Sequence, residues 1–257
     1  MRGKLALIRK KNGIGNVTIN RPHVMNAVTI ELMSTLIDAF EEIASDENIR
    51  VIVLEGEGEN FSTGADMALL QRDIDSSQWL EWMEDPIGKL ILTMRTIPQP
   101  VICKVRGNVI GYGVGLALAG DFVVASHDTR FREVFVNLGV TLDGGASYFL
   151  PRLVGMAKAK EIALLGEVID GRTAASIGLI YKSVPEEELD HVVESLAGVL
   201  SKKSIKSMST IKKNLEKSVN MTLEEALAWE AFHQAILLTG NELKESVNRF
   251  SNSHKKV

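Results

Sequence analysis

The first half of the chain alternates short apolar runs with helix-like segments, and this order constrains the fold more than any other feature. Val51–Leu54, Val101–Val105 and Phe122–Ala125 are short, continuous apolar runs typical of buried strands. Residues 30–44 instead place apolar side chains at helical spacing, directly after Thr29, which is a favourable N-cap. The pattern predicts a mixed α/β core.

The chain opens with two further strand-like runs. Leu5–Ile8 and Ile14–Ile19 flank Lys11-Asn12-Gly13, a turn sequence that predicts a hairpin. With the following helix and strand this gives a β-β-α-β opening, and a helix over 111–119 gives a second β-α-β passage. The two passages are similar in the order of their elements, but their sequences do not repeat.

The pattern changes after Pro151 to one predicted helix after another. The predicted helices are Ala157–Leu165, Ala174–Ile177, Glu188–Leu200, Ile205–Lys217 and Leu223–Leu238, with one strand candidate at Leu179–Val184. Apolar stripes on such helices favour packing or oligomer contacts over catalysis. Residues 72–90 have poor periodicity, and we expect them to be mobile or variable.

Composition narrows the possible classes of protein. With 257 residues, 45% of them hydrophobic, the chain can bury a sizeable core, and its net charge of −4 provides no broad basic field for nucleic acid. No apolar run reaches the roughly 18 residues of a membrane span, and the N-terminal apolar stretch is too short for a signal sequence. The single cysteine, Cys103, lies in an apolar strand, which fits a reducing compartment and predicts a cytoplasmic protein.

Two glycine-rich strand-to-helix junctions are the first candidates for chemistry. Gly64 in 60–67 and the glycines of 107–115 leave backbone amides without intrahelical partners. Alone, the first junction is better explained as an ordinary turn in which Asp66 stabilises a helix start. Together they supply two donors for one oxygen, as an oxyanion hole requires. The glycine spacing does not match a dinucleotide fingerprint, and the sequence has neither a P-loop nor a Gly-x-Ser-x-Gly elbow.

Two acids compete as proton-transfer groups. Asp143, followed by two glycines, either caps a helix that begins near Ala146 or projects from a loop as a base or nucleophile. Glu133 would alternate away from Phe131 and Phe135 on a strand, which predicts a solvated or salt-bridged side chain. The five histidines are scattered without ligand spacing, so we predict no metal site.

Together these motifs resemble the crotonase superfamily, the enoyl-CoA hydratase/isomerase family, over nearly the whole chain. The matching pieces are Asn20–Ala27, Phe61–Met67, Gly107–Gly113, Asp121, Asp143–Gly155 and Ala174–Ile180. The resemblance implies a spiral of β-β-α units over residues 1–200 and a helical C-terminal trimerisation region over 201–257. It also implies a homotrimer or a dimer of trimers.

The resemblance further implies a thioester enolate held by the backbone amides of Ala65 and Tyr112. Coenzyme A, as part of the substrate and with no other cofactor, would then contact the segments at 23–27 and 63–67, and Gly111 and Phe135 would also bind the substrate. The expected coenzyme A contacts are His23, Val24, Met25, Ala27, Thr63, Asp66 and Met67. Only His23 supplies a basic group where relatives often carry lysine.

Departures from the family pattern decide the predicted reaction. The two glutamates of the hydratases correspond to Gly115 and Phe135, and neither residue can move a proton. Asp143 remains, at the position where some isomerases hold their base and 4-chlorobenzoyl-CoA dehalogenases their nucleophile. We therefore expect enoyl-CoA isomerisation by Asp143, with a pKa raised by Leu142 and Phe135. The alternatives are a hydratase or dehydratase that recruits another acid, and an acyl-CoA-binding protein without catalysis.

A last departure is Tyr112, because the middle residue of this glycine-rich turn is usually glycine or alanine in the family. Its ring would either narrow the acyl pocket or supply a phenol.

Overall fold

The computed structural model describes residues 4–244 and 247 of the chain. The chain divides into two compact units, Met1–Ser201 and Lys202–Val257, which are described separately. The larger unit is mixed α/β and the smaller one is helical in its described part.

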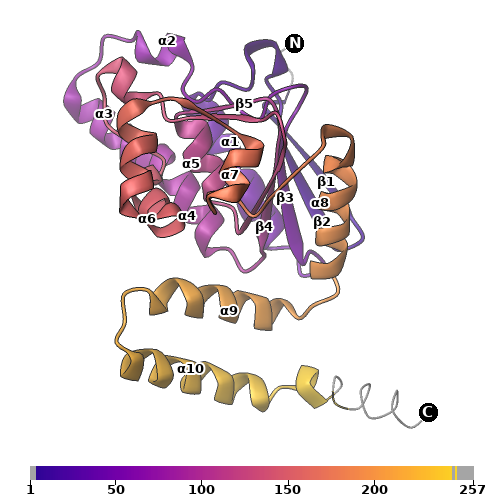
Figure 1. Cartoon of the computed structure of the whole chain (residues 1–257). Helices are drawn as coiled ribbons and strands as arrows, with labels where there is room; N and C mark the ends of the chain where they lie inside the picture. The colour runs from indigo at the N-terminus through magenta and orange to yellow at the C-terminus, as the bar shows by residue number, and fades with distance from the viewer. Residues whose placement is uncertain (1–3, 245–246, 248–257) are drawn as a thin grey trace. The chain divides into compact units, whose positions relative to one another are not determined.

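A six-stranded sheet forms the centre of the larger unit, in the order β1-β2-β3-β4-β6-β9 (Figure 1). Its strands are β1 (Ala6–Lys11), β2 (Ile14–Ile19), β3 (Val51–Gly56), β4 (Val101–Val105), β6 (Phe122–Ser126) and β9 (Lys182–Val184). β1 and β2 are antiparallel, and the other neighbours are parallel. The predicted hairpin is confirmed, because Asn12 and Gly13 both have positive φ and close a two-residue turn from Lys11 to Ile14.

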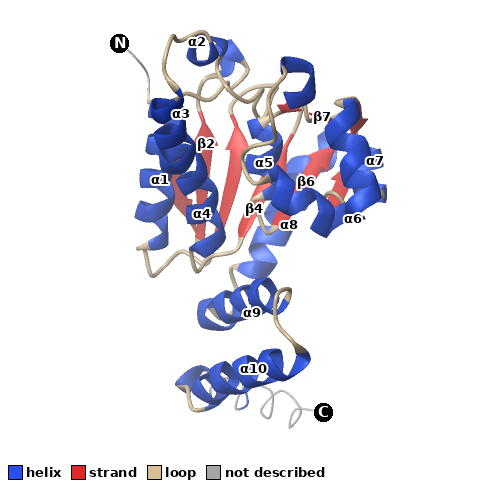
Figure 2. Cartoon of the chain, turned by 90° about the vertical axis from the view of Figure 1, so that its left-hand side faces the viewer, coloured by secondary structure: helices blue, strands red, loops and turns tan. Residues whose placement is uncertain are grey.

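Helices bury both faces of this sheet, which explains why its central strands are continuously apolar. Ile52 and Leu54 of β3 belong to the core that includes α1 (Ile30–Ala44) and α5 (Tyr112–Leu118), whereas Val51 and Val53 pack with α8 (Glu186–Leu200) on the other face (Figure 2). Thr29 caps α1 as predicted, since its side chain accepts a hydrogen bond from the Leu32 N–H.

A second, three-stranded sheet was not predicted from the sequence. It consists of β5 (Asn108–Ile110), β7 (Arg130–Arg132) and β8 (Val168–Asp170), in the order β5-β7-β8. Three-residue strands are too short to show alternation. This small sheet leads directly into the glycine-rich turn at Gly111.

Several helical segments differ from their predicted bounds. Residues 72–90 contain α3 (Ser76–Trp82), the π-helical segment η2 (Met83–Gly88) and the start of α4 (Lys89–Thr96). The helix predicted at Ala157–Leu165 is the second half of α6 (Ala146–Leu165), which is interrupted at Gly155 by non-helical backbone angles. Shorter elements are α2 (Met67–Leu70), α7 (Gly171–Ser176) and the 3₁₀ turns η1 (Pro22–Val24) and η3 (Phe135–Leu138).

The smaller unit contains α9 (Ile205–Ser218) and α10 (Leu223–Leu238), which pack against each other. Ser204 caps α9, and Thr222 with Glu225 forms a capping box at the start of α10. Large apolar side chains such as Ile211, Leu215 and Phe232 are more than half exposed. Trimerisation through this unit stays a prediction.

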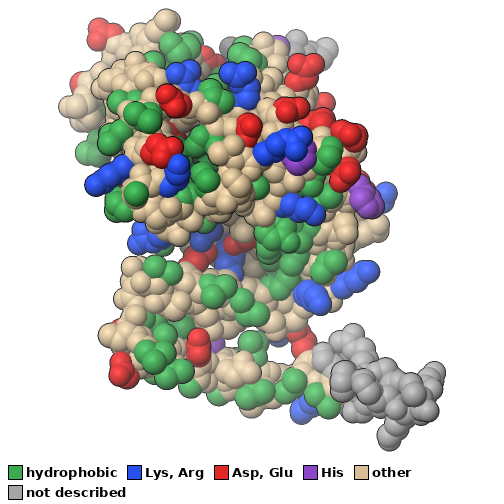
Figure 3. Space-filling view, viewed as in Figure 1, with side chains coloured by type: hydrophobic (Ala, Val, Ile, Leu, Met, Phe, Trp, Pro, Cys, Tyr) green, Lys and Arg blue, Asp and Glu red, His purple; other side chains and the backbone are tan. Residues whose placement is uncertain are grey.

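Acidic and basic side chains are interspersed over the visible face of the described residues (Figure 3), as expected from the small net charge. Within the described residues, no helix is both long and apolar enough to cross a membrane.

Candidate active site

The two glycine-rich junctions lie side by side. The loop at 61–64 pairs with β5: the Ile110 N–H donates to the Ser62 carbonyl over 3.0 Å, and the Ser62 N–H donates to the Asn108 carbonyl over 3.2 Å. Gly64 has φ +79°, and a Cβ there would lie 2.5 Å from the Ile110 oxygen and 3.3 Å from the Tyr112 nitrogen. Only a glycine allows so close an approach.

This contact brings two backbone donors together. Tyr112 is the first residue of α5, and Ala65 follows Gly64. Neither the Tyr112 N–H nor the Ala65 N–H donates a hydrogen bond within the described part of the chain. Two adjacent free N–H groups can hold one oxygen that gains negative charge.

The Tyr112 side chain is buried next to the turn that carries Asp143. It is 2% exposed, and its hydroxyl donates to the Ile87 carbonyl over 2.9 Å. Burial, with a smaller contribution from the charge of Asp143, raises the pKa of Tyr112 far above its ordinary value. The phenol is therefore a buried donor tied to the backbone, and its ring lies 3.0 Å from the position that a Cβ on Gly144 would take.

Asp143 lies on the turn before α6, close to the same helix α5. Its side chain does not cap α6, because the N-cap residue is Gly145 and no side chain caps that end. The helix-cap interpretation of Asp143 is thus wrong. Its Oδ1 is buried without a hydrogen-bond partner, and burial raises the pKa of Asp143 to about 6.

The structure also explains why the position of Gly115 carries no acid. A Cβ on Gly115 would lie 2.4 Å from the Gly144 carbonyl oxygen, so the turn that carries Asp143 fills the space of a side chain. Phe135 occupies the other position where hydratases hold a glutamate. It is 7% exposed, and its ring lies 3.6 Å from the position that a Cβ on Gly111 would take. Phe135 thus adds an apolar wall beside the glycine-rich turn.

The prediction that Glu133 lies on a solvated or salt-bridged face is wrong. Glu133 is 1% exposed, and neither carboxylate oxygen has a hydrogen-bond partner among the described residues. β7 ends at Arg132, so strand alternation does not extend to Glu133. Burial, and next the charge of Asp143, raises the pKa of Glu133 to about 8. The sequence signal that could have indicated this burial is the position of Glu133 between two phenylalanines, Phe131 and Phe135.

Comparisons with known proteins agree with this geometry. The family model described as enoyl-CoA hydratase/isomerase matches residues 9–257. The chain belongs to the enoyl-CoA hydratase/isomerase family, within the crotonase superfamily of enzymes. The resemblance seen in the sequence motifs is thereby confirmed.

Individual members of the family are similar over almost their full length. A trans-2-decenoyl-[acyl-carrier-protein] isomerase of Streptococcus mutans is 29% identical over 98% of this chain and 97% of its own. A 1,2-epoxyphenylacetyl-CoA isomerase of Escherichia coli is 30% identical over 93% and 92%. The crystal structure of an enoyl-CoA hydratase from Polaromonas sp. JS666 superposes with a TM-score of 0.92 at 28% identity, over 96% of this chain and 97% of the other. The α/β fold of the crotonase superfamily is therefore shown.

The two segments expected to contact coenzyme A in this family lie next to each other. The Thr63 N–H donates to the Met25 carbonyl over 3.2 Å, and the Asp66 N–H donates to the Val28 carbonyl over 2.9 Å. Met25 and Met67 are about half exposed, at 48% and 58%. Val24 and Ala27 lie on the same segment as Met25, within or just after η1.

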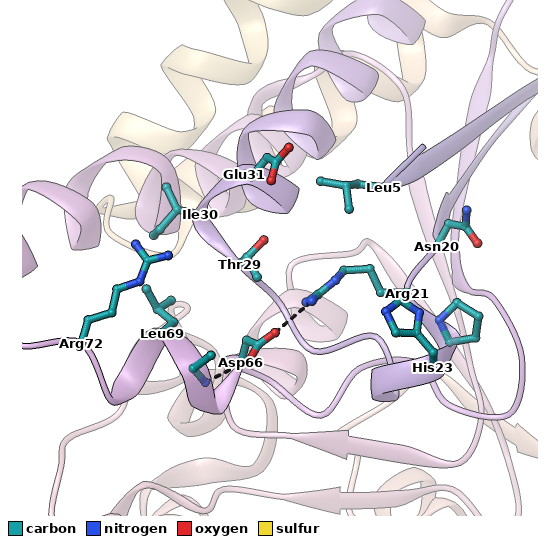
Figure 4. Close-up of a pocket in the computed structure, with 12 residues that line it drawn as sticks. Leu5, Asn20, Arg21, His23, Thr29, Ile30, Glu31, Asp66, Leu69 and Arg72 are labelled. Carbon is teal, nitrogen blue, oxygen red and sulfur yellow. Dashed lines mark hydrogen bonds and ion pairs between the residues drawn. The ribbon is translucent and has the colours of Figure 1, made fainter. Parts of the chain in front are cut away.

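A surface groove of about 1030 Å³ begins beside these segments (Figure 4). His23 and Asp66 line it, together with Arg21 and Arg72. Burial alone would raise the pKa of Asp66, but hydrogen bonds from the Ala68 N–H and from Arg21 outweigh it and lower the pKa. Asp66 is therefore the N-cap of α2 and the partner of Arg21 at 2.9 Å, so its carboxylate is already engaged.

The groove is only part of the expected site. Ala65, Tyr112 and Asp143 are not among the residues that line it. Arg72 lies 5.6 Å from the Trp82 ring, a cation–π contact. His23 is the basic residue within the expected coenzyme A segments. Within residues 4–244 and 247, no three His, Cys, Asp or Glu side chains cluster as metal ligands would.

Proposed function

We propose that this protein isomerises the double bond of an enoyl-CoA thioester, with Asp143 as the base and the Ala65 and Tyr112 N–H groups as the oxyanion hole. The observation that carries the proposal is Asp143 itself, a half-buried carboxyl with raised pKa and an unpartnered oxygen. Its neighbour Gly144 lies against α5, whose first residue, Tyr112, supplies one of the two free backbone donors. A base with a pKa of about 6 is well matched to work near neutrality.

The chemistry follows from these groups. Asp143 removes a proton from the saturated carbon that lies next to the thioester carbonyl or at the end of its conjugated double bond, and the electrons move onto the thioester oxygen. Donation by the two N–H groups stabilises this enolate. Return of a proton at the other end of the conjugated system completes the shift, so the enolate chemistry needs no cofactor besides the coenzyme A of the substrate.

The residues at the two positions where the hydratases hold glutamates argue against hydration. Addition of water needs one group to activate the water and another to protonate carbon. Position 115 has no room for a side chain, and Phe135 has no titratable group. The Streptococcus mutans relative is named a trans-2-decenoyl isomerase, which supports a double-bond shift, and the Polaromonas structure is named a hydratase, which keeps hydration as the alternative.

The test is an Asp143→Asn variant assayed with a panel of enoyl thioesters in deuterated water and read by mass. We expect a loss of isomerisation of about 10²- to 10⁴-fold, the usual contribution of a positioned acid–base group. Titration with a coenzyme A ester and a thermal melt check that the variant still binds and folds. Undiminished turnover by Asp143→Asn would refute the role of Asp143.

The same panel separates the alternatives. Addition of water, seen as incorporation of ¹⁸O from labelled water, would identify a hydratase. Tight binding without isotope exchange at carbon would identify a binding protein. Because the Streptococcus mutans relative is named for an acyl-carrier-protein substrate, the panel includes one enoyl group on both carriers.

We also propose that the protein is a cytoplasmic homotrimer, or a dimer of trimers, assembled through the region at 201–257. The exposed apolar side chains of α9 and α10 support this assembly. Light scattering on the full chain would show a monomer if the proposal is wrong.

A further inference from the structure

We propose that Glu133 is a second proton carrier of this site, the protonated member of a carboxyl pair whose other member is Asp143. The inference rests on the proposed function and deepens it. Neither glutamate position of the hydratases is involved, because Glu133 lies two residues before Phe135.

The first argument is the position of the segment that carries Glu133. The Gly111 N–H donates to the Arg132 carbonyl over 2.9 Å, and Val134 Cγ1 lies 3.4 Å from the position that a Cβ on Gly111 would take. The residues on both sides of Glu133 therefore contact the turn that presents the Tyr112 N–H.

The second argument is that Asp143 approaches the same helix from another segment. Its neighbour Gly144 lies against Gly115 and against the Tyr112 ring. The first turn of α5 is thus flanked by the chain at 132–135 and by the chain at 143–145. The charge of Asp143 contributes to the raised pKa of Glu133, so the two carboxyls interact.

The third argument is the lack of a compensating cation. The Arg132 guanidinium donates its Nε–H to the Gly166 carbonyl over 2.8 Å, and the Tyr112 hydroxyl is tied to Ile87. No salt bridge to Glu133 or Asp143 is present in the described part of the chain. With pKa values of about 8 and about 6, the pair holds one proton near neutrality, on Glu133.

This protonation state suits a two-carboxyl isomerisation. The Asp143 carboxylate takes a proton from one carbon as the enolate forms, and the Glu133 carboxylic acid gives its proton to the other carbon as the enolate collapses. The product leaves a neutral Asp143 and an ionised Glu133. Asp143 then releases its proton to solvent and Glu133 takes one from solvent, which restores the starting state, so charges and protons balance.

The experiment compares wild type, Glu133→Gln and Glu133→Asp with an unlabelled substrate in deuterated water. If Asp143 acted alone, part of the substrate proton would return to the same molecule. With Glu133 as donor, initial product of the wild type carries solvent deuterium in nearly every molecule. We expect Glu133→Gln to be about 10- to 100-fold slower. Its residual product should retain more of the substrate proton.

The pH profile supplies a readout that a purely structural role would not move. The decline of kcat/KM of the wild type above about pH 8, where Glu133 loses its proton, should disappear in Glu133→Gln and persist in Glu133→Asp. Glu188→Gln, an exposed acid on α8, is the matched control and should behave as wild type in all assays.

The outcomes separate this inference from the function on which it rests. Activity in Asp143→Asn would overturn both. An inactive Asp143→Asn together with a Glu133→Gln variant of unchanged isotope content and unchanged pH profile would overturn the role of Glu133 alone. A slower Glu133→Gln that keeps both signatures would mean that Glu133 is only structural, and would also overturn it.

Discussion

The acids at the candidate site are buried and have no cationic partner, whereas the acids on the opposite face of the central sheet are more exposed and form salt bridges. Near α8, Lys104 binds Glu55 and also Asp190, the latter at 2.9 Å, and Arg106 lies 2.9 Å from Asp190 and 3.2 Å from Glu186. Glu133 and Asp143 have no such cations within the described residues.

The pKa shifts follow this difference. Hydrogen bonding to Lys104 is the main cause of the lowered pKa of Asp190, whereas burial is the main cause of the raised pKa values of Glu133 and Asp143. Exposed ion pairs add little stability, whereas unpaired buried acids cost stability and are frequent at functional sites. The contrast marks the candidate site without reference to any relative.

The largest expected effect concerns the space that the Asp143 turn occupies. Gly115→Ala places a methyl group 2.4 Å from the Gly144 oxygen, so backbone must move. We expect a loss of about 3 kcal/mol in the free energy of unfolding, measured by urea denaturation, and little activity. Gly198→Ala, in α8 with nothing within 4 Å of the added Cβ, is the control. Normal stability of Gly115→Ala would show that the turn can move away, so that a glutamate at this position would also fit.

The second effect is the pH dependence of stability. The folded protein holds the Glu133 proton up to about pH 8, whereas an unfolded glutamate loses it near 4.5. Since the folded state then binds more protons, the free energy of unfolding should fall as the pH rises between these values. Glu133→Gln should flatten this slope and gain about 2 kcal/mol at the alkaline end. An unchanged slope would show that Glu133 is solvated.

These two effects depend on features that differ in how far the sequence predicts them. The hairpin, the cap at Thr29 and the buried strands were predictable because each is a local pattern of a few residues. The two glycine-rich junctions predicted a pair of converging donors, and the family resemblance identified them as Ala65 and Tyr112, but the close contact of Gly64 with Tyr112 has no local signal. It depends on β5, whose three residues carry no periodic signal.

Glu133 was predicted incorrectly for a physical reason. Alternation assumes that a strand continues, but the chain leaves β7 at Arg132 and enters the 3₁₀ turn at Phe135. The chain around Glu133 contacts segments distant in sequence, such as the turn at Gly111 and Gly166. No local pattern encodes such contacts.

The third effect tests whether the phenol of Tyr112 takes part in the chemistry. Tyr112→Phe removes the hydrogen bond to Ile87 but keeps the ring against Gly144. We expect a loss of about 1 kcal/mol in stability and turnover within about tenfold of wild type, because the hydroxyl serves as a structural donor. If a well-folded Tyr112→Phe lost activity as strongly as Asp143→Asn, the phenol would have to be counted among the proton carriers.

The smallest expected effect concerns Asp190, one of the acids that form salt bridges near α8. Asp190→Asn removes the partner of Lys104 and Arg106, yet the Asp190 side chain is 64% exposed, and exposed ion pairs contribute little. We expect a loss below about 0.5 kcal/mol at neutral pH that shrinks further in high salt. Because the pKa of Asp190 is lowered by folding, this contribution is present above the unfolded pKa and disappears in acid, opposite in sign to that of Glu133. Urea denaturation of Asp190→Asn and Glu133→Gln over the same pH series would therefore give difference curves of opposite slope. Parallel curves would contradict the distinction between paired and unpaired acids on which the assignment of the site depends.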